Sequence, residues 1–340
     1  MRKFVVGVAS AFAVLTAGCA TAPVAPPAPA PAPTVTLTTE KAITLPGTGG
    51  HGDVVVADPS AHAVYIAQSP DNNVVVIDTT TNAVKAVIPH IPSANGITFT
   101  DPYVFVAEAP ANAVAVIAKA TWQVVATVPS GGKTPDALYY DSKDNSVFVA
   151  NDDSNNMQEF TAAAPFTIQG TLTLQPSPAK SGPDLGTYSP AEDRIYQADD
   201  NDVVVVDAKN RVIQRVIQLQ LPNGTAAKDM YYEQAHHLLW IATSGPEVLA
   251  VDTDTGTTVA TVKTASGADQ VAADPQRGLL FIGEGKAGAM GVIDLATRHA
   301  LANLKTEPDF HTQDSLPGTD LVYVYLNTSN VIDVDRIAIH

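Results

Sequence analysis

The chain has 340 residues, of which 45% are hydrophobic and only 16% are charged. This composition excludes an intrinsically disordered protein, because disordered chains carry too little apolar surface to build a core. The formal net charge is −16 and no run of Lys or Arg occurs. Since binding nucleic-acid phosphates requires clustered cations, we expect a folded acidic protein with no nucleic acid among its partners.

Residues 1–18 have the pattern of an export signal: two basic residues, an apolar stretch and then small residues before Cys19, the only cysteine. The segment "LTAGC" resembles the cleavage motif of a bacterial lipoprotein signal, although Thr16 replaces the Leu that is commonest there. The resemblance implies a lipid anchor on Cys19. Ala20 lacks the acidic signal for inner-membrane retention, which implies the outer membrane. The alternative is an ordinary secretory signal.

Residues 19–36 form the next segment, in which Pro and Ala alternate as "APVAPPAPAPAP". Such a sequence favours polyproline II and cannot form a core, so we expect a semi-rigid spacer after the lipidated cysteine. The globular domain is predicted to occupy residues 37–340. The lipid would hold it in the bacterial cell envelope, facing the periplasm or the cell surface.

One short pattern recurs through this domain, in which a large residue lies within a strand such as "AVYIAQ" or "SVFVAN". The seven large residues are Tyr65, Phe105, Phe148, Tyr196, Trp240, Phe281 and Tyr323. They are spaced 40 to 48 residues apart. This spacing is typical of the four-stranded blades of a β-propeller.

The first unit is predicted to contain strands at Asp53–Asp58, Ala63–Gln68, Asn73–Thr79 and Ala83–Ile88, which we name A to D. The seventh unit lacks strand D, and Glu40–Gly47 near the N-terminus has the missing pattern. We therefore predict an all-β fold: a seven-bladed β-propeller whose last blade is closed by the N-terminal strand. The alternatives are an open solenoid and a pair of β-sandwiches, which the complementary ends disfavour.

The stretch "VYIAQSPDNNVVVIDTTTNAVKAVI" is similar to the YVTN-type propeller repeat, and "VFVAND" at Val147 is closest to the tetrapeptide that names it. The resemblance extends over Glu40 to His340. It implies the propeller fold. Proteins with this repeat include surface and periplasmic binding proteins, and seven-bladed relatives include lactonases and redox enzymes that carry cofactors. Function must therefore be argued from the site rather than from the fold.

In a propeller the D–A and B–C loops share one face, and strand A begins at the mouth of the central channel. We transferred the register of the first unit to the other six, taking the A–B turn of the second unit as three residues shorter. This places one residue per blade at the mouth: Asp53, Gly96, Asp136, Asp184, Lys228, Asp269 and His311. The matching ends of strand B are Gln68, Glu108, Asn151, Asp199, Thr243, Glu284 and Leu326. We expect a negative mouth and take Asp53, Glu108, Asp136, Asp184, Lys228, Asp269, Glu284 and His311 as candidate ligand-binding residues.

Two interpretations of these acids remain open. Each Asp can accept hydrogen bonds from the neighbouring blade, or several can converge on Ca²⁺ or another divalent cation. Lys228 can bind an anionic group or pair with a neighbouring Asp. His51, His90 and His311 lie in D–A loops of adjacent blades and form a possible metal site, although a loop histidine is more often solvated.

No covalent haem motif, nucleophile elbow, phosphate loop or dinucleotide fingerprint is present. We therefore predict no cofactor beyond a possible divalent cation. The favoured function is an envelope-anchored, monomeric binding or scaffold propeller that recognises a small molecule or a protein on its D–A/B–C face. The alternative is an enzyme, a lactonase-like or other metal-assisted hydrolase that uses the acids at the channel mouth.

Overall fold

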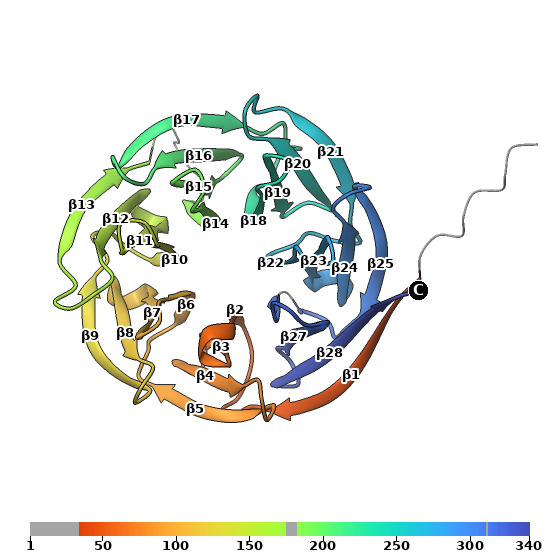
Figure 1. Cartoon of the computed structure of the whole chain (residues 1–340), viewed down its shortest axis with the longest axis horizontal. Helices are drawn as coiled ribbons and strands as arrows, with labels where there is room; N and C mark the ends of the chain where they lie inside the picture. The colour runs from red at the N-terminus through yellow and green to blue at the C-terminus, as the bar shows by residue number, and fades with distance from the viewer. Residues whose placement is uncertain (1–33, 175–181, 311) are drawn as a thin grey trace, which may run out of the picture. The chain divides into compact units, whose positions relative to one another are not determined.

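A computed structural model describes residues 34–174, 182–310 and 312–340. These residues form seven four-stranded antiparallel sheets arranged in a ring, with strand A of each sheet at the centre and strand D at the rim (Figure 1). The structure confirms the all-β, seven-bladed propeller. No helix in the described part of the chain is long and apolar enough to span a membrane.

In each of the first four blades the strands follow one another along the chain from A to D. Blade 1 contains β2 (Gly52–Asp58), β3 (Ala63–Gln68), β4 (Asn73–Asp78) and β5 (Ala83–Pro89). Blade 2 contains β6 (Ala94–Phe99), β7 (Tyr103–Glu108), β8 (Ala113–Ala118) and β9 (Gln123–Pro129). Blade 3 contains β10 (Pro135–Asp141), β11 (Ser146–Asn151), β12 (Asn156–Thr161) and β13 (Ile168–Thr173). Blade 4 contains β14 (Pro183–Ser189), β15 (Arg194–Asp199), β16 (Asp202–Asp207) and β17 (Val212–Gln218).

The remaining blades have the same order from centre to rim. Blade 5 contains β18 (Ala227–Glu233), β19 (Leu238–Thr243), β20 (Glu247–Asp252) and β21 (Thr258–Lys263). Blade 6 contains β22 (Val271–Asp274), β23 (Leu279–Glu284), β24 (Ala289–Asp294) and β25 (His299–Lys305). Blade 7 contains β26 (Thr312–Ser315), β27 (Leu321–Leu326), β28 (Val331–Ile339) and β1 (Val35–Thr44). Short 3₁₀ turns lie at η1 (Pro59–Ala61), η2 (Ala109–Ala111), η3 (Asp152–Ser154) and η4 (Gly285–Ala287).

The core is divided among the interfaces between neighbouring blades. Each of seven hydrophobic clusters in the described residues joins side chains from two adjacent sheets. The seven large residues of the repeat are all in these interfaces and are at most 2% exposed. Strands B and C are buried on both faces, which explains their near-continuous Val and Ile runs. The repeat therefore encodes the packing of blade against blade.

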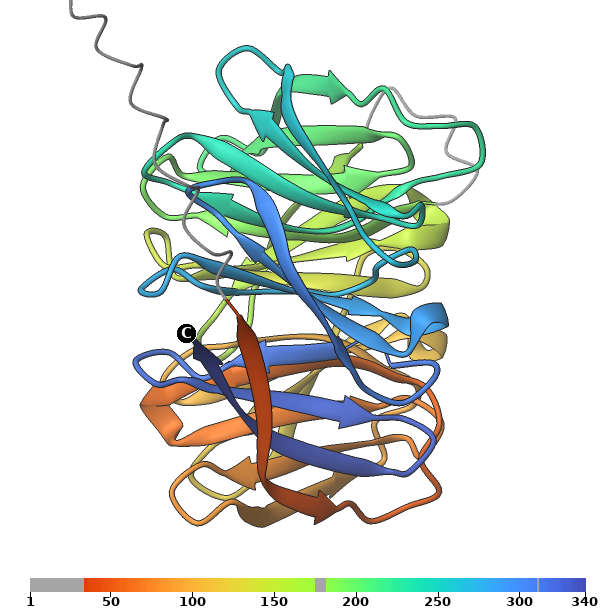
Figure 2. The same ribbon diagram turned by 90° about the vertical axis from the view of Figure 1, so that its right-hand side faces the viewer.

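The N-terminal strand closes the ring. β1 pairs antiparallel with β28, from Val35 opposite Ile339 to Thr44 opposite Val331. Figure 2 shows the two strands side by side at the edge of the ring. β1 begins and ends earlier than the predicted Glu40–Gly47, because its pairing with β28 extends over the whole length of that strand.

The register of blade 2 differs from the predicted one. In β6, Phe99 is opposite Val104 of β7, whereas the equivalent pair in blade 1, Ala57 and Val64, is two residues farther apart along the chain. The A–B turn of blade 2 is thus shorter by two residues and not by three. Asn95, not Gly96, therefore occupies the channel-mouth position in blade 2.

Candidate functional site

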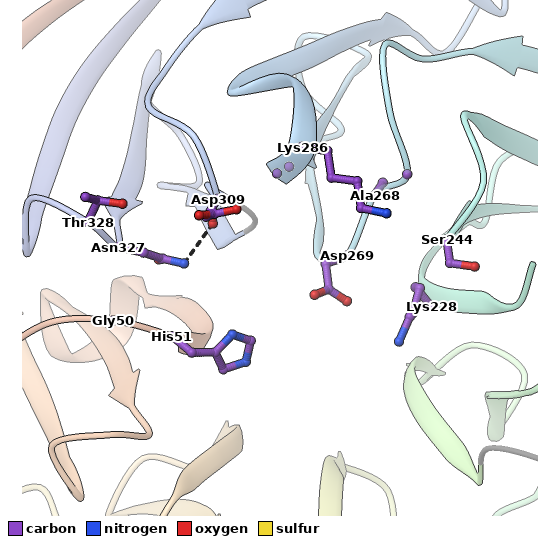
Figure 3. Close-up of a pocket in the computed structure, with 13 residues that line it drawn as sticks. Gly50, His51, Lys228, Ser244, Ala268, Asp269, Lys286, Asp309, Asn327 and Thr328 are labelled. Atoms are coloured by element: carbon purple, nitrogen blue, oxygen red, sulfur yellow. Dashed lines mark hydrogen bonds between the residues drawn. The ribbon is translucent and has the colours of Figure 1, made fainter.

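The D–A and B–C loops lie on one face of the ring, which we call the mouth face. Between blades 5, 6, 7 and 1 these loops enclose a cavity of about 560 Å³ at the mouth of the channel. Its wall includes His51, Lys228, Asp269, Lys286 and Asp309. Figure 3 shows the side chains of His51, Asp269 and Lys228 directed towards the same opening, although they come from three different blades.

Lys228 forms the central ion pair of the mouth. Its Nζ donates to Asp184 Oδ2 at 2.6 Å, which joins the beginning of β18 to the beginning of β14 in the preceding blade. Burial raises the pKa of Asp184 to about 6; Lys228 opposes this rise and the Asp269 carboxylate adds to it. Burial disfavours the charged form of Lys228, but Asp184 and Asp269 together raise its pKa above the ordinary value. Lys228 is therefore a cation at neutral pH.

His51 is the second basic group at the mouth, and its Nε2 lies 3.7 Å from Asp53 Oδ1. The adjacent Asp53 carboxylate raises the pKa of His51; burial opposes this rise, and the charge of Asp269 reinforces it. The other oxygen of Asp53, Oδ2, is buried and has no hydrogen-bond partner in the described part of the chain. Asp53 therefore favours the protonated imidazolium of His51.

Asp136 lies at the beginning of β10 and accepts a hydrogen bond from Asn95 Nδ2 at 3.2 Å. Burial raises the pKa of Asp136 well above its ordinary value, and the carboxylates of Asp53 and Asp184 raise it further. The neutral form of Asp136 is thereby favoured, so the mouth is less negative than a count of its acids implies. Asn95 was missed in the sequence because its position depends on the length of a turn.

The two glutamates predicted for the mouth lie behind it. Glu284, at the end of β23, is fully buried, and its Oε2 accepts a hydrogen bond from the Ala265 N–H in the D–A loop that enters blade 6. Glu108, at the end of β7, is 6% exposed, and burial raises its pKa. Neither side chain is part of the cavity wall. Glu284 holds the loop that carries Asp269.

One of the predicted metal ligands lines the cavity. It is His51, while His90 is exposed directly after β5. His311 and Cys19 lie outside the described residues. Within residues 34–174, 182–310 and 312–340, no three His, Cys, Asp or Glu side chains are grouped so that they could hold a metal ion. The described residues thus supply single polar groups and ion pairs rather than a metal-binding cluster.

Further hydrogen bonds between blades come from two acids that sequence reasoning did not select. Asp229 Oδ2 accepts from the Val271 N–H of the next blade at 2.9 Å, and Asp314 Oδ2 accepts from the Ala57 N–H at 2.8 Å. Burial raises the pKa of Asp314 to about 7, although hydrogen bonds from the N–H groups of Ala57 and Ser315 oppose the rise. Strand A therefore carries acids of two kinds, some at the mouth and others between blades.

Comparison with solved structures gives the same fold. A chain of Kuenenia stuttgartiensis hydrazine synthase superimposes with a TM-score of 0.72 at 13% identity, covering 87% of this chain and 97% of that one. A chain of the mitotic checkpoint complex superimposes with a TM-score of 0.76 at 13% identity, covering 95% and 98%. At these identities the likeness shows the fold alone. No family model and no curated protein matches the sequence.

The cavity combines basic and acidic groups within one space. His51, Lys228 and the exposed Lys286 provide N–H donors and positive charge, while Asp269 provides a carboxylate. A cavity of this volume is large enough for a small organic ligand. The arrangement is chemically suited to a molecule that carries an anionic group, or both an anionic and a cationic group.

Proposed function

We propose that the protein is a binding propeller that takes a small zwitterionic or anionic organic molecule at the channel mouth. The observation that carries this proposal is the placement of His51, Lys228 and Lys286 around one cavity in a chain whose net charge is −16. Cations are few in this chain, and three basic side chains meet there. Asp269 is available for a cationic group on the same ligand.

A thermal-melting screen tests this function. The probes are the free amino acids and small dicarboxylic acids, each added to the full chain at about 10 mM, a concentration chosen to exceed a weak Kd. Because a ligand that binds only the folded state stabilises it, at least one probe should raise Tm. Lys286→Ala should reduce that shift, and because Lys286 is exposed, we expect its loss to leave the fold intact.

Lys209→Ala is the matched control, because Lys209 is exposed on a C–D turn at the opposite face. It removes the same charge and should leave the shift unchanged. If no probe raises Tm, or if both lysine variants reduce the shift equally, the small-molecule proposal fails and a protein partner on the mouth face becomes the better explanation. A Tm that rises with Ca²⁺ and falls with EDTA would instead favour the metal-assisted hydrolase.

We also propose that the chain belongs with the YVTN-type propellers and is attached to the bacterial outer membrane by lipid on Cys19. The repeated B–C hairpin of the blades and the motif before Cys19 support this assignment. Metabolic labelling with a fatty-acid analogue should mark the wild-type chain but not Cys19→Ser. We propose a monomer, since the ring is closed within one chain, and light scattering of the labelled protein in detergent tests this.

A further inference from the structure

A second cavity, of about 470 Å³, opens on the opposite face of the ring, where the A–B and C–D turns lie. We call it the turn-face hollow. Phe99, Thr100, Asp101 and Pro102 line it from the end of β6 and the A–B turn of blade 2, and Tyr140 lines it from β10 of blade 3. It shares no lining residue with the cavity at the channel mouth.

The hollow exists because blade 2 departs from the repeat. In the other six blades the A–B turn joins paired residues that are two residues farther apart in the chain than Phe99 and Val104. The short turn of blade 2 leaves a space between the turns of blades 1 and 3. Ser60 borders this space on one side, and Asn145 borders it on the other.

A buried hydroxyl in the hollow has no hydrogen bond. Thr100 is 7% exposed, and its Oγ1 has no partner among the described residues. By register Thr100 is the equivalent of Asp58 in blade 1, whose carboxylate accepts from Ser60 and Tyr65. Buried polar atoms in proteins are nearly always paired, so an unpaired one in the wall of a cavity points to a group supplied by a ligand.

The charge of the hollow is negative. Asp101 is exposed, and no other Asp or Glu and no Lys, Arg or His occurs among the described residues that line the hollow. Lys119 lies over the ring of the lining residue Phe99 at 4.6 Å, and it is paired with Asp58. Burial raises the pKa of Tyr140, and the charges of Asp101 and Asp141 raise it further.

We propose that the turn-face hollow is a second binding site, which takes a small primary amine with an aromatic body. The ammonium group pairs with Asp101 and donates a hydrogen bond to Thr100 Oγ1, the neighbouring residue. The body packs against Phe99, Pro102 and Tyr140, which provide apolar surface and aromatic faces. A carboxylate ligand is disfavoured, because it would meet Asp101, and no Lys, Arg or His is among the described residues that line the hollow.

Three probes of matched shape test this site by saturation-transfer NMR and calorimetry on the full chain. They are 2-phenylethylamine, which is a cation, 2-phenylethanol, which is neutral, and 3-phenylpropanoate, which is an anion. The amine should bind at least about tenfold more tightly than the anion, which corresponds to one charge-assisted contact. Asp101→Asn should weaken binding of the amine by about tenfold, and Thr100→Val by about threefold.

Asp254→Asn is the matched control, because Asp254 is an exposed acid on the C–D turn of blade 5, on the same face but outside the hollow. It should leave amine binding unchanged. Equal binding of the three probes, equal effects of Asp101→Asn and Asp254→Asn, or no saturable binding of the amine would each overturn the proposal. Asp101 is exposed, so its variant tests binding without disturbing the core.

Discussion

Blades 1 and 2 have the same four strands but opposite chemistry at their A–B turns. In blade 1 the buried Asp58 accepts hydrogen bonds from Ser60, Ala61 and Tyr65, and it also pairs with Lys119 of blade 2. In blade 2 the acid is replaced by Thr100, and the tyrosine is replaced by Phe105, which has no hydroxyl group to donate. The comparison shows that the blades pack against one another through strands B and C, whereas the A–B turns differ between blades. The turn of blade 1 holds a polar network, and the turn of blade 2 borders a cavity.

The largest expected effect comes from removing the acid of blade 1. Asp58→Ala leaves the Lys119 ammonium buried at 8% exposure without its carboxylate, and it removes the acceptor of several donors. Breaking a buried pair in this way costs about 3–5 kcal/mol of unfolding free energy. Urea unfolding measures the loss. Asp78→Ala, at a more exposed C–D turn, should cost much less, and equal losses would show that the blade 1 network is unimportant.

Removing the cation should have a smaller effect than removing the acid. In Lys119→Met the Asp58 carboxylate keeps the donors from Ser60, Ala61 and Tyr65, and the Met side chain still covers Phe99. The expected cost is about 1.5–3 kcal/mol, the value of one hydrogen bond to a charged group. The same urea experiment ranks the two variants. If Lys119→Met lost more unfolding free energy than Asp58→Ala, the cation and not the acid would be the more important partner of the pair.

Removing the equivalent polar group of blade 2 should not reduce stability. Thr100→Val removes a hydroxyl that has no partner, so stability should stay unchanged or rise by up to about 1 kcal/mol. The matched control is Thr253→Val, because the Thr253 hydroxyl is buried and donates to the His237 carbonyl at 3.0 Å. That control should lose about 1 kcal/mol. A similar loss in both variants would mean that the Thr100 hydroxyl is paired in solution.

The smallest expected effect is the pH dependence of the stability that Asp58 contributes to blade 1. Burial raises the pKa of Asp58, but hydrogen bonds from Lys119, Ser60 and Tyr65 outweigh it, so the net pKa is lowered. A lowered folded pKa gives stability that is present above the ordinary pKa and is lost as pH falls through the folded value. The difference in unfolding free energy between wild type and Asp58→Asn should therefore narrow below about pH 4. A difference that stays constant between about pH 3 and pH 7 would contradict this assignment.

The ring was predictable from the sequence because every blade repeats the same buried hairpin around one large residue, such as Trp240 or Tyr323. Ring closure was predictable because the C-terminal unit lacks the strand that the N-terminal segment provides. The mouth was predictable only in outline. The length of the A–B turn in blade 2 decides whether Asn95 or Gly96 lies at the channel mouth. No sequence pattern distinguishes a turn that is two residues shorter from one that is three residues shorter. Turn length is set by backbone register, which only the structure shows.

The acids of strand A illustrate the same limit. Asp184 and Asp229 both lie near the beginning of strand A in neighbouring blades, one register position apart, yet Asp184 pairs with Lys228 at the mouth and Asp229 accepts from the Val271 N–H of the next blade. A bulge in strand A separates these positions, because the pairing of β18 with β19 shifts between Ala227 and Met230. A side chain one residue along such a bulge faces a different neighbour.

The pairing of β1 with β28 has a consequence for the time course of biosynthesis. β1 is among the earliest segments of the domain to leave the ribosome, and its partner is the last strand to do so. At about 5–20 residues per second, β1 waits roughly fifteen to sixty seconds without a partner. During that interval β1 has no strand to pair with, and the two end blades of the incomplete ring have uncovered apolar faces. The final strand of the domain therefore acts as a checkpoint, because a product truncated before β28 can neither pair with β1 nor close the ring.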